Sequence, residues 1–255
     1  MAMNTDKNSY TIIFSVAMVI VVGSVLAFTA SSLKKSIKEN KRTEKQQNIL
    51  YAMGVRNEND PNAFVDAAKA DQLFQKYIGD NQYIVSGNRA EKSTEAFDID
   101  IKKEIDKTKQ DSEYERKNPL FIGEKDGQKF YIMPVRGNGL WDAIWGYVSL
   151  GSDFKYINGA YFDHKGETPG LGANIVEAYF IEDFLGESIL DEQGNFVGVT
   201  VKKGNSDPKN TRKDDNAVDA LAGATITGDG VTAMVKKGLY EYLPYFKTIK
   251  NKSNG

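Results

Sequence analysis

The sequence contains no cysteine and a single histidine, His164, among its 255 residues. Without cysteine the chain forms no disulfide, no iron–sulfur cluster on its own thiolates, no cysteine-ligated zinc site and no thiol nucleophile. One histidine also cannot build a site with several imidazole ligands within one chain. These absences exclude the common metalloprotein and thiol-enzyme classes for this chain by itself.

An excess of charge of one sign is lacking as well. The chain has 33 Lys and Arg against 35 Asp and Glu, a net charge of −2, which argues against a nucleic-acid binder held by a basic face. With 40% hydrophobic and 11% aromatic residues it can bury a core, so wholesale disorder is excluded. The mean hydropathy of −0.47 is typical of a soluble protein and conceals one apolar segment.

That segment is the uncharged stretch Asn8–Leu33, whose apolar centre is Ile12–Ala30. A helix needs about 20 apolar residues to cross a bilayer, so residues 1–33 are predicted to form a single-pass transmembrane anchor. Two alternatives stay open. A cleaved signal peptide has a basic start and a shorter apolar core, whereas this chain starts with only Asp6 and Lys7 as charges. A buried helix of a soluble protein is normally shorter or amphipathic.

Basic residues follow the anchor and bear on its orientation. By the positive-inside rule alone, this end of the span would lie in the cytoplasm, but the rule weakens when a long domain follows. Charge alone therefore leaves the orientation open. The residues are Lys34, Lys35, Lys38, Lys41, Arg42 and Lys45.

Residues 34–118 are predicted to be a helical and charged connecting region packed on the domain that follows. Residues 34–55 would extend the anchor helix, with Gly54 as its stop. A charged stretch, 86–118, is predicted to be a solvated surface with a short strand at Phe97–Ile101, and a binding role is the alternative.

A second helix is predicted between these segments. Asp60 would cap it, Pro61 would occupy its first position, and Gly79 would follow its end. Apolar side chains recur at helical spacing in between. They are Phe64, Ala67, Ala68, Phe74, Tyr77 and Ile78.

The last segment, residues 119–255, is predicted to be a ligand-binding domain of the α+β class, with an antiparallel sheet flanked by helices. Its sequence alternates predicted strands with tight turns, which indicates antiparallel pairing. The expected strands are Leu120–Ile122 and Lys129–Val135 around Asp126-Gly127, then Tyr147–Leu150 and Phe154–Phe162 around Gly151–Asp153, then Phe196–Val201; a helix is expected at Asn174–Leu185.

Two glycine-rich loops are candidates for ligand contact. Gly137–Trp141 places small residues beside an aromatic ring, which lets a flat ligand approach the backbone. Composition alone favours the other interpretation, a turn that leads into a strand and whose tryptophan belongs to the core. In the second loop, Glu167–Gly172, Glu167 and Thr168 could hydrogen-bond a polar ring edge and Leu171 could cover a ring face.

A third candidate lies just before a predicted amphipathic helix. Thr225 follows Gly223 and Ala224, and Thr227 or Asp229 would cap the helix. Free backbone N–H groups and the positive end of the helix dipole favour an anion there. On composition alone the segment is predicted to be a capped helix start, and contact with a phosphate group is the alternative.

These three segments together resemble one family. Asp219–Thr225, D-A-L-A-G-A-T, resembles the flavinylation motif D-x-x-[S/T]-G-A-T, in which the last threonine carries FMN through a phosphoester bond; Ala222 departs from the usual Ser or Thr. E-T-P-G-L-G at Glu167–Gly172 and G-N-G-L-W at Gly137–Trp141 resemble companion motifs of the same FMN-binding domain. Their order is similar to that of the C subunits of the sodium-translocating NADH:quinone oxidoreductases.

The resemblance implies a covalently bound FMN cofactor and a set of site residues, with no metal ligands. Thr225 would be the attachment residue and Asp219 would assist the modifying flavin transferase. The other expected FMN contacts are Gly223, Ala224, Glu167, Thr168, Leu171, Gly139, Leu140 and Trp141.

The resemblance also implies a role in a complex. The chain would relay single electrons from a metal centre in neighbouring membrane subunits toward quinone, as part of a sodium-transporting, NADH-oxidising translocase. Its expected partners are those subunits, the flavin transferase and the lipid bilayer, with no nucleic acid. The family places the flavin domain outside the bacterial cytoplasmic (inner) membrane, on the periplasmic side, against the orientation that the flanking charges favour.

Three other functions remain as alternatives. The G subunit of the Rnf-type ferredoxin:NAD oxidoreductase shares the anchor and the flavin domain but usually lacks much of the region 34–118. A membrane-anchored module could use the same loops to bind a phosphorylated ligand without redox work. A self-sufficient flavin reductase would need a nicotinamide site, and no dinucleotide fingerprint follows a strand in this sequence.

Overall fold

The computed structural model describes residues 8–205, 207 and 209–253. Asp6 and Lys7, which bear on the signal-peptide alternative, lie outside these residues. The chain divides into two compact units, one that ends at Lys45 and one that begins at Gln46. The predicted boundaries at residues 33 and 118 stay predictions.

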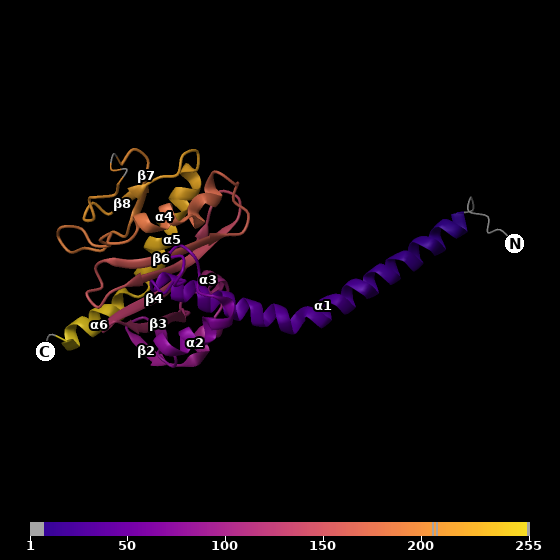
Figure 1. Cartoon of the computed structure of the whole chain (residues 1–255), viewed down its shortest axis with the longest axis horizontal. Helices are drawn as coiled ribbons and strands as arrows, with labels where there is room; N and C mark the ends of the chain where they lie inside the picture. Colours follow the sequence, from indigo (N-terminus) through magenta and orange to yellow (C-terminus); the bar gives the residue numbers. More distant parts are fainter. Residues whose placement is uncertain (1–7, 206, 208, 254–255) are drawn as a thin grey trace. The chain divides into compact units, whose positions relative to one another are not determined.

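Helix α1, Asn8–Ala52, supplies the described residues of the first unit as far as Lys45, and its last residues belong to the second unit (Figure 1). Its apolar stretch has a mean hydropathy of 2.6 and none of it is buried, so by length and composition it can cross a membrane. This exposure contradicts the alternative of a buried core helix. The helix ends as predicted before Gly54, which has a φ of +80°.

The second unit contains a six-stranded antiparallel sheet with the strand order β2-β1-β3-β4-β5-β6. The predicted turn at Asp126 and Gly127 is confirmed, because both residues have positive φ, 53° and 75°, and strands β3 and β4 pair directly on either side. The strands are β1 Gln82–Ser86, β2 Arg89–Lys92, β3 Asn118–Lys125, β4 Gln128–Asn138, β5 Ala143–Leu150 and β6 Ile157–His164. The α+β class with an antiparallel sheet is therefore confirmed.

A small two-stranded sheet joins β7, Thr200–Lys202, to β8, Ala217–Asp219. This pair is parallel, with Val201 opposite Val218. The strand predicted at Phe196–Val201 is thus shorter than expected, and Phe196 makes only an isolated bridge with Leu190.

Helix α5, Thr225–Tyr240, packs closely on strand β4 and is followed by α6, Leu243–Ser253. The approach requires glycine on both elements: a Cβ on Gly137 would lie 2.8 Å from the Met234 Cβ, and one on Gly238 would lie 2.5 Å from the Val135 Cγ1. This contact fixes the start of α5 near the end of β4.

Helix α2 spans Ala67–Tyr77 and begins later than predicted. The Asp60 carboxylate accepts a hydrogen bond from the Asn62 backbone at 2.9 Å, so it stabilises a local turn rather than capping a helix. Asp60 and Pro61 can either start a helix or form a turn, and in this structure they form the turn. The predicted stop is confirmed, because Gly79 has a φ of +53°.

The strand predicted at Phe97–Ile101 is wrong. The chain forms a 3-10 helix, η1 Thr94–Asp98, and then helix α3, Ile101–Gln110. The Asp100 carboxylate accepts hydrogen bonds from the backbone N–H groups of Lys102 and Lys103, which starts the helix. The alternation of apolar residues that suggested a strand includes Phe97, which is buried in the core from a 3-10 helix.

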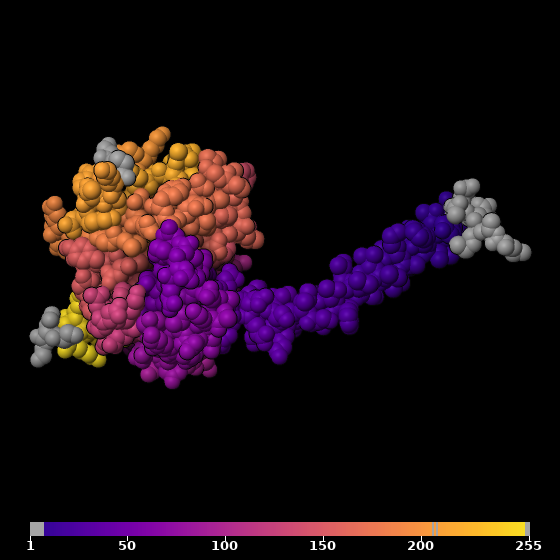
Figure 2. All heavy atoms as spheres, in the orientation of Figure 1, coloured from indigo at the N-terminus to yellow at the C-terminus, as the bar shows by residue number. Residues whose placement is uncertain are grey.

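The helix predicted at Asn174–Leu185 is divided into two short pieces. A 3-10 helix, η2 Gly172–Val176, precedes helix α4, Ala178–Asp183, and Glu177 between them is extended. In the second unit, the residues that precede β3 share one core with the residues that follow it. Figure 2 shows the purple atoms of the first group beside the pink and orange atoms of the second. The end of α1 contributes Ile49 and Leu50 to this common core, and Met53, which follows the helix, also belongs to it.

Candidate functional site

A buried carboxylate, that of Glu167, joins the three candidate segments. Its side chain is only 4% exposed. The Oε1 atom accepts hydrogen bonds from the backbone N–H groups of Trp141 at 2.9 Å and of Asp142 at 3.5 Å. The Oε2 atom accepts one from the Thr227 hydroxyl at 2.7 Å. The turn before β5, the loop after β6 and the first turn of α5 therefore meet at one side chain.

The Glu167 carboxyl is held in its charged form. Burial raises its pKa, but hydrogen bonds from the Thr227 hydroxyl and from the N–H groups of Trp141, Asp142 and Leu140 outweigh burial, so the pKa lies below its ordinary value. An ionised carboxylate accepts hydrogen bonds more strongly than a neutral one. The charge therefore strengthens the junction of the three segments.

Two glycines are required at this junction because the carboxylate approaches their backbone. A Cβ on Gly139 would lie 2.5 Å from the Glu167 Oε1. One on Gly172 would lie 2.5 Å from the Thr227 hydroxyl oxygen and 2.6 Å from the Glu167 Oε2. The glycine pattern that the sequence presents thus has a packing cause here.

Two polar contacts fasten the first two loops to each other at the surface. The indole Nε1 of Trp141 donates to the Thr168 hydroxyl at 3.1 Å. The Asp142 carboxylate forms an ion pair of 2.7 Å with Lys165. The hydrogen bond from Lys165 is the main cause of the lowered pKa of Asp142. The Trp141 ring is 69% exposed, so its face is open to a ligand.

Helix α5 begins at Thr225, which is exposed, and no side chain caps it. Ala224 occupies the N-cap position and has no side-chain acceptor. The prediction that Thr227 or Asp229 caps the helix is wrong, since Thr227 lies inside the first turn and donates to Glu167. The first N–H groups of the helix are thus left without a side-chain cap, which suits a phosphate group.

Exposed apolar side chains surround the start of α5. Gly223, with a φ of +72°, brings the chain close to Leu171, whose Cδ2 would lie 2.8 Å from an added Cβ. Four apolar side chains from the two loops and the first turn of α5 are between 41% and 69% exposed. They are Leu140, Trp141, Leu171 and Ile226. Such a rim fits the flat rings of an aromatic ligand.

The structure changes the expected role of one residue, Glu167. Both Glu167 oxygens are engaged by protein donors, so this residue supports the loops from beneath. Asp219, at the end of β8, is half-buried, and among the described residues its side chain forms no hydrogen bond with the other candidates. The sequence reasoning missed Asp142 and the true role of Thr227. In the sequence, Thr227 was marked only by its hydroxyl group and its place two residues after Thr225, beside a segment rich in small residues.

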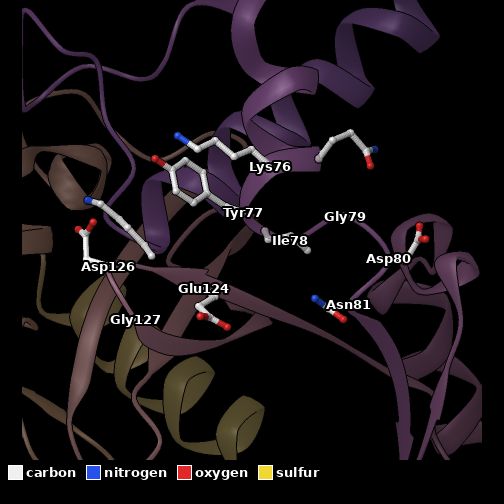
Figure 3. Close-up of a pocket in the computed structure, with 11 residues that line it drawn as sticks. Lys76, Tyr77, Ile78, Gly79, Asp80, Asn81, Glu124, Asp126 and Gly127 are labelled. Atoms are coloured by element: carbon white, nitrogen blue, oxygen red, sulfur yellow. The ribbon is translucent and has the colours of Figure 1, made fainter.

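A cavity of about 760 Å³ lies apart from these residues, between the end of α2 and the turn that joins β3 and β4 (Figure 3). Its lining is mainly polar and includes Asp80, Glu124 and Asp126. None of the candidate residues contributes to it. Among the described residues no group of three or more His, Asp or Glu is placed to hold a metal ion.

Comparison with known proteins agrees with the geometry. The model of the FMN-binding domain family matches residues 139–240, which includes all three segments from Gly139 onward. The C subunit of the Na(+)-translocating NADH-quinone reductase of Neisseria meningitidis serogroup B is 30% identical over 264 aligned positions, which cover 98% of each chain. The chain belongs to this family of reductase C subunits.

Two solved structures of this family share the fold. The C subunit of the Na(+)-translocating NADH-quinone reductase of Parabacteroides distasonis is 32% identical, with a TM-score of 0.70, and the match covers 84% of this chain and 96% of that one. NqrC of Shewanella oneidensis is 24% identical, with a TM-score of 0.66 over 83% and 99% of the two chains, and supports the fold alone. Family membership confirms the resemblance drawn from the motifs.

Proposed function

We propose that this chain is the FMN-carrying electron-transfer subunit of a membrane-bound Na(+)-translocating NADH-quinone reductase. Family membership and the FMN-binding domain match support this function. The observation that carries it is the meeting of three loops at Glu167 beside an uncapped helix start with an exposed threonine. A tethered flavin supplies reversible electron transfer at that place.

In this proposal FMN is attached covalently to Thr225. The threonine hydroxyl oxygen forms a phosphoester with the FMN phosphoryl group, so the chain gains the mass of FMN less one water. The residue is exposed and is the first of α5, and the free N–H groups of the first turn would bind the phosphate oxygens. Gly223 and Ala224 leave room for the phosphoryl group. Asp219 would assist the flavin transferase.

The flavin rings would lie on the apolar rim. Leu140, Trp141 and Leu171 would contact the ring system, and Gly139 would let it approach the backbone. The Thr168 hydroxyl, which accepts from the Trp141 indole, keeps its own proton free to donate to a polar ring edge. Glu167 would hold these groups in position without touching the rings.

The proposed role needs other subunits. The chain has no cysteine and can ligate no iron–sulfur cluster by itself. It would hold FMN between a metal centre of neighbouring membrane subunits and the next carrier toward quinone, so that single electrons pass through the complex. A covalent tether suits a relay because the cofactor never leaves and its distance to both partners is fixed.

The site of action would be the bacterial cytoplasmic (inner) membrane, with α1 as a single-pass anchor and the flavin domain on the periplasmic side. The apolar, fully exposed stretch of α1 supports the anchor. The test of orientation is protease treatment of spheroplasts. External protease should digest the domain, whereas protection of the domain would overturn this orientation.

The attachment is tested with Thr225→Ala in cells that contain the flavin transferase. We expect the band of the variant to lose its flavin fluorescence in a denaturing gel, and its intact mass to lack the FMN adduct. Thr200→Ala, at an exposed threonine of β7, is the matched control and should keep both signals. Retained fluorescence of Thr225→Ala would refute the attachment residue. An unmodified native chain would favour a phosphate-binding module without redox work.

A further inference from the structure

A groove of about 780 Å³ runs between helices α3 and α5 on the face of the second unit that carries strand β4. Its apolar lining comes from Ile105 of α3 and from Ala233 and Met234 of α5, with Gly137 and Gly238 at the close contact between α5 and β4. Neither the proposed FMN attachment nor the rim around Thr225 uses this surface.

The groove is strongly basic although the whole chain is nearly neutral. Two acidic residues, Asp106 and Glu241, line it, and each is paired with a groove cation: Asp106 with Lys109 at 3.6 Å and Glu241 with Arg116 at 3.5 Å. The other groove cations form no ion pair in the part of the chain that the structure describes. They are Lys102, Arg136, Lys236 and Lys237. The unpaired charge of the groove is therefore about +4 by simple count.

The groove begins at the proposed flavin site. Asn138 and Gly230 both line it, and Asn138 directly precedes Gly139 of the first loop. A Cβ on Gly230 would overlap the Asn138 carbonyl oxygen, so α5 and this loop touch there. From Gly230 the groove follows α5 to Glu241, which is about 16 Å of helix. A molecule bound along it would lie beside the cofactor.

We propose that this groove docks an acidic, amphipathic polypeptide segment of a neighbouring subunit of the complex. Acidic side chains of the segment would pair with the four cations that form no ion pair among the described residues, and its apolar side chains would cover Ile105 and the exposed Tyr240. A small anion fits less well, because the lysines stand exposed on flexible side chains at the rim and the floor is apolar. The proposal rests on the chain's proposed place in the reductase, and it would position a partner next to the flavin.

Photo-crosslinking in the assembled complex identifies the occupant. Benzoylphenylalanine replaces Ala233, an exposed residue of the groove, and in the control it replaces Lys103, an exposed residue of α3 that does not line it. From position 233 we expect a cross-link to a segment rich in Asp and Glu in another subunit, at a yield at least tenfold above that from position 103. A lipid or nucleotide adduct, a segment without excess acid, or equal yields would overturn the proposal.

Charge reversal tests whether the attraction matters. Lys102→Glu with Lys237→Glu should lower retention of this chain in the complex purified at 0.3 M salt at least fivefold. Lys103→Glu with Lys247→Glu changes the net charge equally outside the groove and should leave retention unchanged. Equal retention of both variants would refute the docking.

Flavin fluorescence and the unfolding temperature of each variant serve as separate readouts. Both variants should keep the fluorescent band, since Thr225 is untouched, and both should unfold at the temperature of the native chain. If the native chain carries no flavin but still cross-links at position 233, the proposed function fails and the docking stands. If flavin is present without an acidic cross-link, the docking alone fails.

Discussion

At the residue scale, the chemistry of the site depends on how one carboxylate is used. The sequence predicts Glu167 against a ring edge, because a carboxylate in a glycine-rich loop can bind a polar ligand. The structure engages both of its oxygens with Trp141, Asp142 and Thr227 instead. A buried carboxylate is costly unless its lone pairs are satisfied, so the protein donors take precedence over a ligand.

Thr227→Val should therefore weaken the fold in a pH-dependent way. The pKa of Glu167 lies below its ordinary value of 4.5, so its ionised form stabilises the fold above that pH, and this stability is lost as the pH falls through the folded-state pKa. Removing one donor should lower the free energy of unfolding by about 1–3 kcal/mol at pH 7 and by less at pH 3. Denaturant unfolding of the full chain in detergent measures both values. Thr200→Val is the control, and an equal loss at both pH values would contradict this role.

The pKa of a second buried carboxylate, that of Glu187, is shifted upward, opposite to the shift at Glu167. Glu187 is fully buried, and neither of its oxygens has a hydrogen bond among the described residues, although Lys213 lies 3.7 Å away. Burial raises its pKa to about 7. The folded chain then binds this proton more tightly than the unfolded chain, so stability falls as the pH rises from 4.5 to about 7.

Glu187→Gln should consequently stabilise the chain at alkaline pH. We expect the free energy of unfolding to rise by about 3 kcal/mol at pH 8 and to change little at pH 4, where the native carboxyl is already neutral. Denaturant unfolding at the two pH values checks this, with the exposed Glu192→Gln as the control. A loss of stability at pH 8 would show that the Lys213 pair outweighs the cost of burial.

At the element scale, the sequence predicts a turn correctly where the backbone conformation of its own residues determines it. It does not predict the starts of α2 and α5 correctly. Asp126-Gly127 determines its hairpin through backbone conformation alone. The start of α2 was misplaced because Asp60 has two local uses, as a cap or in a turn, and neighbouring packing decides between them. Likewise α5 begins at Thr225, two residues before one predicted cap, Thr227, and four before the other, Asp229. The Thr227 side chain instead binds Glu167.

The junction of loops and helix predicts different effects for two glycines of one loop. Gly172→Ala would place a Cβ against Thr227 and Glu167 and should cost about 1–3 kcal/mol of stability, with a loss of covalent flavin. Gly166→Ala meets no atom within 4 Å and should be nearly neutral. Thermal unfolding and in-gel fluorescence compare the two variants. Similar behaviour of both would mean that the close approach at Gly172 does not constrain the site.

At the scale of the whole molecule, the anchor helix also belongs to the core of the second unit. Helix α1 continues to Ala52, and its last turn buries Ile49 and Leu50, while Met53 follows directly. The compact second unit accordingly begins at Gln46, about two turns before the end of this helix. The membrane segment can be removed from the chain without loss of core, but the end of the helix cannot.

Two truncations make this division measurable. A chain that begins at Lys38 should be soluble without detergent and unfold cooperatively. A chain that begins at Asn57 loses several buried apolar side chains, among them Ile49, Leu50 and Met53. These three alone are worth roughly 2–3 kcal/mol each, a total close to the whole stability of a typical domain, so this chain should not fold. Near-ultraviolet circular dichroism and thermal unfolding distinguish the two. A cooperative transition in the shorter chain would show that the last turn of α1 is dispensable.

The sequence by itself determined the anchor, the antiparallel class, the hairpin turns and the three glycine-rich segments, because each depends on composition or on contacts between near neighbours. It also determined the family, since the order of the motifs is a property of the chain. Only the tertiary structure decided that Glu167 fastens these segments together and that α3 and α5 gather unpaired lysines beside them. Those features join residues that are tens of positions apart, and the distance between such residues is determined by packing, not by local preference.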